Sequence, residues 1–216
     1  MTIRNRLYAA IVITLAALGI LLGVAIFGMA KLNDTFDRVE RAADDRALAL
    51  DLKFDVTDFN GWQTAYGYDN GASRPIFLRS VAHFDRDLAQ ARSQLARPGE
   101  QRLVDRVEQA SADFMRLDRV AFAALQAGRT AEVRRLLLGP EIEHFQRAAL
   151  AADRLAELES VRADAEKQAF HDDRSDSLRL LVVSAAGAAI FVVILLLTSI
   201  DLARRERSPV EPDDQD

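Results

Sequence analysis

The sequence predicts an all-α membrane protein in which two transmembrane helices flank an extracytoplasmic antiparallel four-helix bundle. Two charge-free apolar runs, residues 7–30 and residues 180–200, lie near the two ends of the 216-residue chain. Between them, apolar residues recur every three or four positions, which is the spacing of packed helices. The chain has no Cys, which excludes a disulfide framework, a Cys-based zinc site and a thiol nucleophile.

The first apolar run contains no charged residue from Leu7 to Ala30. At about 1.5 Å per residue its helix exceeds the roughly 30 Å hydrocarbon core of a bilayer. We therefore predict that residues 7–30 form a transmembrane helix. A cleaved signal peptide is the alternative, because Arg4 and Arg6 supply a basic start. The apolar region of a signal peptide is usually shorter, about 7–15 residues, and this favours retention.

The second span is predicted over residues 178–200, which are charge-free from Leu180 onwards. Arginines lie outside both spans: Arg4 and Arg6 before the first, and Arg204, Arg205 and Arg207 after the second. Because cationic flanks stay in the cytoplasm, residues 1–6 and the tail 201–216 are expected inside the cell. Residues 31–177 are then expected outside it, and the chain is expected in the cell membrane with the lipid bilayer as its first partner.

Turn-forming residues divide the exterior segment into helices. The breaks are Asp69–Ser73, Arg97–Gly99, Gly128 and Gly139–Pro140. Pro75 suits a first helical turn and Thr130 suits an N-cap. Neither Gly nor Pro lies between residues 141 and 177, so the last exterior helix is expected to continue into the second span. The first span is likewise expected to continue into the first exterior helix.

Each exterior helix carries an apolar stripe of the kind that packs in a bundle. The expected core residues are Leu32, Phe36, Val39, Ala43, Ala47, Leu50 and Phe54 on the first helix, Phe77, Val81, Phe84, Leu88, Ala91 and Leu95 on the second, Leu103, Val107, Ala110, Phe114, Leu117, Ala121 and Ala124 on the third, and Ile142, Phe145, Ala149, Ala152 and Leu155 on the last. Short connections between such helices favour antiparallel neighbours.

Amide and aromatic side chains gather at the end of the first exterior helix. Asn60 and Gln63 are three residues apart, and Trp62 and Tyr66 are four apart, so each pair shares a helix face. They are candidates for the edge of a pocket that recognises a small polar ligand. The alternative is structural: the two rings cover the apolar end of the bundle while the amides bond loop carbonyls.

Arginines on the second helix are candidates for binding an anionic ligand, because the guanidinium fork matches a carboxylate. Arg79 is the candidate among them. The alternative is that these arginines belong to a charged helix face that contacts only solvent. The three histidines (His83, His144, His171) lie far apart in the sequence, and no phosphate loop or nucleophile motif is present. We expect no enzyme activity, no metal and no cofactor, and the formal net charge of −5 gives no sign of nucleic-acid binding.

Small residues in the spans are candidates for helix association. Gly19 and Gly23 are four apart in the first span, and Ser184 and Ala188 repeat this pattern in the second. Close backbone approach is a main source of helix association in lipid. Contact within one chain and contact between two copies are both compatible with the pattern.

Residues 1–203 resemble the sensor half of a bacterial methyl-accepting chemotaxis receptor of the four-helix-bundle type. The stretch Asp58–Asp69 (DFNGWQTAYGYD) is similar to a tract at the end of the first sensor helix in such receptors. The run Ala127–Phe145 (AGRTAEVRRLLLGPEIEHF) is similar to the segment before their final helix. The resemblance implies ligand sensing and signal transduction across the membrane, as in chemotaxis.

The sequence after Ile200 departs from that family, because its 16 residues leave no room for a HAMP relay or a cytoplasmic signalling hairpin. We therefore expect the chain to act as an accessory subunit, a homodimer or a heteromer with a signalling receptor or kinase, that binds a small molecule of unknown identity. The alternative is a structural or scaffolding membrane protein, or a degenerate receptor, that binds no ligand.

Overall fold

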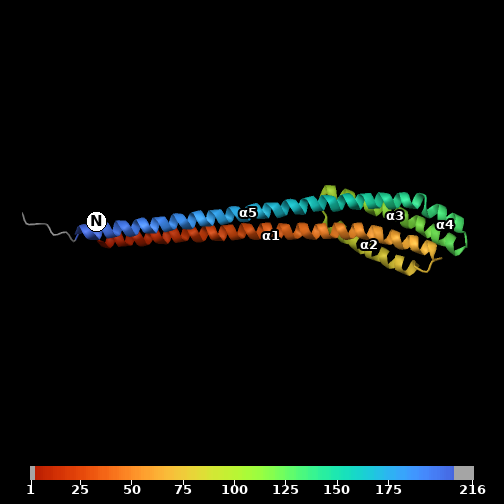
Figure 1. Cartoon of the computed structure of the whole chain (residues 1–216), viewed down its shortest axis with the longest axis horizontal. Coiled ribbons are helices and arrows are strands. Elements are labelled where there is room, and N and C mark those ends of the chain that lie inside the picture. Colours follow the sequence, from red (N-terminus) through yellow and green to blue (C-terminus); the bar gives the residue numbers. More distant parts are fainter. Residues whose placement is uncertain (1–2, 207–216) are drawn as a thin grey trace, which may run out of the picture. The chain divides into compact units, whose positions relative to one another are not determined.

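The computed structural model describes residues 3–206, which form five α-helices and no strand (Figure 1). The helices are α1 (Ile3–Tyr68), α2 (Arg74–Gln94), α3 (Pro98–Gln126), α4 (Thr130–Leu137) and α5 (Pro140–Glu206). The prediction of an all-helical chain is therefore confirmed. The ten residues 207–216, which include Arg207, lie outside the described residues, as do residues 1 and 2.

The chain divides into two compact units, and α1 and α5 each contribute to both. One unit, the helical domain, comprises residues 37–167. The other, the apolar unit, comprises the described residues up to Phe36 and from Gln168 onwards. The two long helices pass from one unit to the other without interruption, as expected from the lack of Pro at these points.

Among the described residues two helices, α1 and α5, are long and apolar enough to cross a membrane. Their most apolar windows are not buried within the described chain, because large aliphatic side chains such as Leu18, Ile20 and Val183 are exposed. At one end of this unit, Lys31 forms an ion pair with Asp173 at 2.8 Å. Thr35 donates a hydrogen bond to the same carboxylate at 3.0 Å.

Within the helical domain, four contacting pairs run in opposite directions: α1 with α5, α1 with α2, α2 with α3, and α3 with α5. In each of these pairs the contact partner comes earlier in one helix as the other helix advances. The contacts are Asp45 to Arg162, Lys53 to Asp153 and Gln63 to Glu141 between α1 and α5; Asp45 to Gln94 and Asp58 to Ser80 between α1 and α2; Arg92 to Asp105 and Arg74 to Asp118 between α2 and α3; and Glu100 to Arg162 and Asp113 to His144 between α3 and α5. α1 and α3 also contact one another but run in the same direction, since Phe59 meets Phe114 and Tyr66 meets Asp118.

One apolar core joins these helices. The Phe59 ring of α1 lies 5.2 Å from that of Phe84 on α2 and 5.1 Å from that of Phe114 on α3. Leu155 of α5 is fully buried in the same cluster. Most of the stripe positions predicted for the second and third helices are buried or packed against this core.

The stripe predicted for the first exterior helix is wrong. Phe54 is 65% exposed and Leu50 is 42% exposed, whereas Leu52 and Val56 are fully buried. The buried face of α1 also carries Asp55, so an acidic residue interrupts its apolar pattern. The spacing of apolar residues therefore pointed to the neighbouring face of α1. Its apolar residues are spaced more regularly in the sequence, but most of them are exposed in the structure.

The predicted breaks lie where the helices end. After Tyr68, Asn70 and Gly71 adopt positive φ angles of 56° and 94°, and the Gly71 amide donates to the Tyr66 carbonyl at 2.8 Å. One detail differs from expectation. Thr130, predicted as an N-cap, is the first residue of α4, and Arg129 holds the N-cap position without a side-chain cap bond.

Candidate functional site

A cavity of about 270 Å³ lies in the helical domain where α1 ends and α5 begins, and we call it the α4 cavity because α4 forms one of its walls. One part of its lining is polar and the other aliphatic. The lining residues are Asn60, Gln63, Thr64, Gly67 and Tyr68 of α1, Leu125 of α3, Thr130, Val133, Arg134 and Leu137 of α4, Leu138, and Ile142 of α5. This composition suits a small amphipathic molecule.

The α4 cavity brings together two of the five residues predicted to bind a ligand. Asn60 is partly exposed and Gln63 is buried, and both lie on the cavity wall formed by α1. Tyr66 is fully buried outside this lining. Trp62 is partly buried, packs against the core and donates its indole N–H to Asp58 at 3.0 Å. Arg79 is exposed on α2 and does not line the cavity.

Gln63 connects the cavity wall to a buried carboxyl group. Its amide nitrogen donates to Oε1 of Glu141, and the Glu141 side chain is 1% exposed. Oε2 of Glu141 has no hydrogen-bond partner among the described residues. Burial, with a further contribution from the negative charge of Asp118, raises the pKa of Glu141 to about 8 against the opposing effect of Arg74. A carboxyl that is protonated at neutral pH costs much less to bury than a carboxylate.

A second buried polar cluster lies beneath the cavity and joins α1, α2 and α3. The Tyr66 hydroxyl donates to Oδ1 of Asp118, and Arg74 pairs with the same oxygen at 2.7 Å. The Arg74 guanidinium also lies over the rings of Tyr66, Phe77 and Phe122, 4.4 to 4.7 Å from their centroids. Burial and the Asp118 charge raise the pKa of Tyr66, which keeps this hydroxyl a neutral donor. These contacts hold the α1 end of the cavity wall in place.

The wall formed by α4 depends on a close approach to α1. A Cβ atom added at Gly67 would lie 2.7 Å from Cδ1 of Leu137, which is too close for any larger residue without a shift. By contrast, a Cβ added at Gly61, also in α1, would meet no heavy atom within 4 Å. The lack of a side chain at Gly67 therefore leaves room for the Leu137 side chain against α1.

Sequence reasoning missed the part that α4 and α5 contribute to the site. Glu141 follows Gly139–Pro140 and has the pattern of an ordinary acidic residue in a first helical turn. The available signal was the expected similarity of residues 127–145 to a segment of chemotaxis receptors, which stays a prediction. That similarity marked the segment but gave no reason to single out Glu141, whose burial depends on contacts with α1.

The apolar unit separates the four residues predicted for helix association. Ala188 lines a shallow groove between α1 and α5 together with Ala17, Leu21 and Ala189 among others. Ser184 is partly exposed one turn earlier on α5. Gly19 and Gly23 are exposed, and a Cβ added at either would meet no heavy atom within 4 Å. The two glycines therefore lie on a face of α1 that α5 does not cover.

Within residues 3–206 there is no group of three or more His, Asp or Glu side chains that is arranged to hold a metal ion. Several of the carboxyl groups described above instead pair with amide, indole, hydroxyl or cationic side chains. The chain matches no family model, no curated protein and no solved structure.

Proposed function

We propose that this chain is a two-span, receptor-like membrane sensor. In this proposal residues 7–30 and 178–200 cross the cell membrane and both termini are cytoplasmic. Residues 31–177 form an extracytoplasmic antiparallel four-helix bundle that binds a small molecule in the α4 cavity. The resemblance to the sensor half of chemotaxis receptors supports this assignment, and so do the two apolar helices and the antiparallel pairing of the helices.

The observation that carries the proposal is the two-sided lining of the α4 cavity. Asn60 and Gln63 offer amide groups on one side, and Val133, Leu137 and Ile142 offer aliphatic surface on another. A ligand with a polar end and a short apolar body satisfies both sides. At about 270 Å³ the cavity is close to the lower end of the range for small-molecule sites, roughly 300 Å³.

The site is placed on the two helices that also carry the apolar spans. Gln63 belongs to α1, and Glu141 and Ile142 belong to the first turn of α5. A ligand that binds more tightly to one arrangement of α5 against α1 shifts the population towards it. Helix displacements of about 1–2 Å are a common form of such a switch. The partner that receives the signal is proposed to be a second copy of the chain or a signalling receptor or kinase.

Ligand binding is tested by thermal denaturation of the full chain in detergent micelles. The probes are the twenty common amino acids, straight-chain carboxylic acids and small aromatic acids, each added separately. A probe that binds only the folded state raises the melting temperature with increasing concentration. The substitution Asn60→Leu should abolish the shift, whereas Arg79→Gln, outside the cavity, should retain it. No shift with any probe, or a shift that survives Asn60→Leu, contradicts binding in the α4 cavity and favours the scaffolding alternative.

The membrane topology has its own test, which uses the lack of native Cys. Single cysteines are introduced by Arg119→Cys, an exposed position on α3, and by Thr2→Cys. A membrane-impermeant maleimide should label the first variant in intact cells and the second only after lysis. Labelling of Thr2→Cys in intact cells, or protection of Arg119→Cys, contradicts the proposed orientation.

A further inference from the structure

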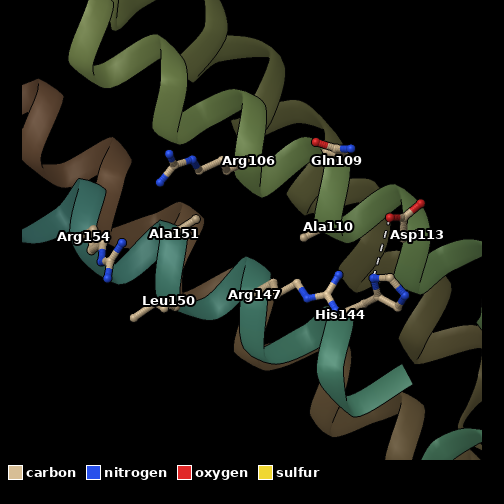
Figure 2. Close-up of a pocket in the computed structure, with 9 residues that line it drawn as sticks. All are labelled: Arg106, Gln109, Ala110, Asp113, His144, Arg147, Leu150, Ala151 and Arg154. Carbon is tan, nitrogen blue, oxygen red and sulfur yellow. Dashed lines mark ion pairs between the residues drawn. The ribbon is translucent and has the colours of Figure 1, made fainter. Parts of the chain in front are cut away.

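A second hollow, of about 310 Å³, lies between α3 and α5 and shares no lining residue with the α4 cavity (Figure 2). Its floor contains two small buried residues, Ala110 of α3 and Ala151 of α5, which are 7% and 5% exposed. Three arginines line it: Arg106 from α3, and Arg147 and Arg154 from α5. We call this hollow the α3–α5 groove. Small side chains on both helices leave space between them that longer side chains on the rim can enclose.

The register of the two helices places Arg106 level with a part of α5 that lies between Arg147 and Arg154. His144 of α5 pairs with Asp113 of α3 at 3.6 Å, and the helices are antiparallel. Arg106 lies seven residues before Asp113, and Ala151 lies seven residues after His144. The two residues are therefore at the same height along the antiparallel helices. At about 1.5 Å per residue, Arg147 and Arg154 then lie roughly 6 Å and 4.5 Å to either side of that level along α5. In Figure 2, Arg106 extends from α3 into the space between the two helices.

The charges in the α3–α5 groove are not balanced. Arg106 and Arg154 are exposed and form no ion pair within residues 3–206. Arg147 has a long contact of 3.6 Å with Glu143. The one acidic lining residue, Asp113, is engaged by Arg116 at 2.8 Å, on the far side from the level of Ala151. The groove therefore holds an excess of positive charge over a partly apolar floor.

We propose that the α3–α5 groove is a binding site for a small organic oxyanion, a dicarboxylate or a phosphate monoester. Arg106 and Arg154 face its anionic oxygens from opposite helices, and the guanidinium fork donates two parallel hydrogen bonds to either group. The short apolar body lies against Ala110 and Ala151. The proposal is independent of the α4 cavity, because it rests on different residues and on a different pair of helices.

The test is isothermal titration calorimetry of the full chain in detergent micelles at constant ionic strength. The probes are glutarate, phenyl phosphate and inorganic phosphate. We expect one bound molecule of glutarate or phenyl phosphate per chain. The probe that binds with the higher affinity shows whether the groove prefers a carboxylate or a phosphate. In the double variant Arg106→Gln/Arg154→Gln the affinity should fall by about tenfold or more, because charge-assisted hydrogen bonds are lost from both sides of the groove.

Two matched controls keep the test specific. Arg102→Gln removes an exposed arginine from α3 that does not line the groove and should leave the affinity unchanged. Asn60→Leu alters the α4 cavity and should also leave it unchanged, so failure of one site is distinguishable from failure of the other. The proposal is overturned if none of the three probes binds, if the double variant binds as tightly as the wild type, or if Arg102→Gln weakens binding equally.

Discussion

Substitution of Glu141 by Gln should remove a large part of the pH dependence of the helical domain's stability. The glutamine side chain has nearly the same shape and remains able to hydrogen-bond Gln63, but it cannot ionise. The pKa of Glu141 is raised from 4.5 to about 8 in the folded chain, mainly by burial. Below pH 4.5 the carboxyl is protonated in both the folded and the unfolded states. Between 4.5 and about 8 only the folded state holds the proton, so the free energy of unfolding falls as the pH rises.

The magnitude follows from the size of that shift. One pKa unit corresponds to about 1.36 kcal/mol. Between pH 5 and pH 8 the wild type should therefore lose about 3–4 kcal/mol more stability than Glu141→Gln. Burial also raises the pKa of Asp55 and of Glu159 to about 7, with contributions from Asp87 and Glu100 respectively. Both groups are present in wild type and variant, so their effects cancel in the difference between the two proteins.

The assay is urea denaturation at a series of pH values, followed by tryptophan fluorescence. Trp62 is the only tryptophan of the chain and packs against the core of the helical domain, so its emission reports on that unit. The curves for wild type and variant should converge near pH 5 and separate as the pH rises, with the variant more stable. Parallel curves over this range would refute the inference that Glu141 is buried in its protonated form.

Two further substitutions, with Gly61→Ala as a control, test the packing around the α4 cavity. Tyr66→Phe removes a buried hydroxyl that bonds Asp118 and should lower the free energy of unfolding by about 1–2 kcal/mol; a loss below a few tenths, measured by the same denaturation assay, would contradict the role of that hydrogen bond. Gly61→Ala, in open space on α1, should stabilise the domain by about 1 kcal/mol, whereas Gly67→Ala should gain clearly less or nothing, because its Cβ forces the Leu137 side chain to shift. Equal effects at the two glycines would show that α4 does not pack on α1 as described.

The sequence was informative wherever structure depends on neighbours along the chain. The apolar runs, the lack of Gly and Pro between residues 141 and 177, and the turn at Asp69–Ser73 correctly predicted where helices run and end. These features depend on local backbone preferences and on hydrophobic length, both of which are visible in a single sequence. The stripes of the second and third helices were also readable, because most of their regularly spaced apolar residues are the ones that pack in the core.

The candidate site was readable only in part. Asn60 and Gln63 were identified because amide and aromatic side chains share faces at the end of the first exterior helix, and both residues line the α4 cavity. Glu141 was missed because its sequence context is that of an ordinary first-turn acid, and its burial arises from a partner 78 residues away. The arginines of the α3–α5 groove were missed because Arg106 and Arg154 lie on different helices and look like part of a solvated surface.

The sequence by itself determined that this chain is helical, where its breaks fall, and that two of its helices are apolar enough to cross a bilayer. Only the tertiary structure decided that α1 buries the face of Leu52 and Val56 rather than that of Leu50 and Phe54. The same structure decided which polar groups meet in the cavity and in the groove. The physical reason is that helical periodicity depends on hydrogen bonds four residues apart. Burial and charge pairing depend on which faces of distant helices fit together.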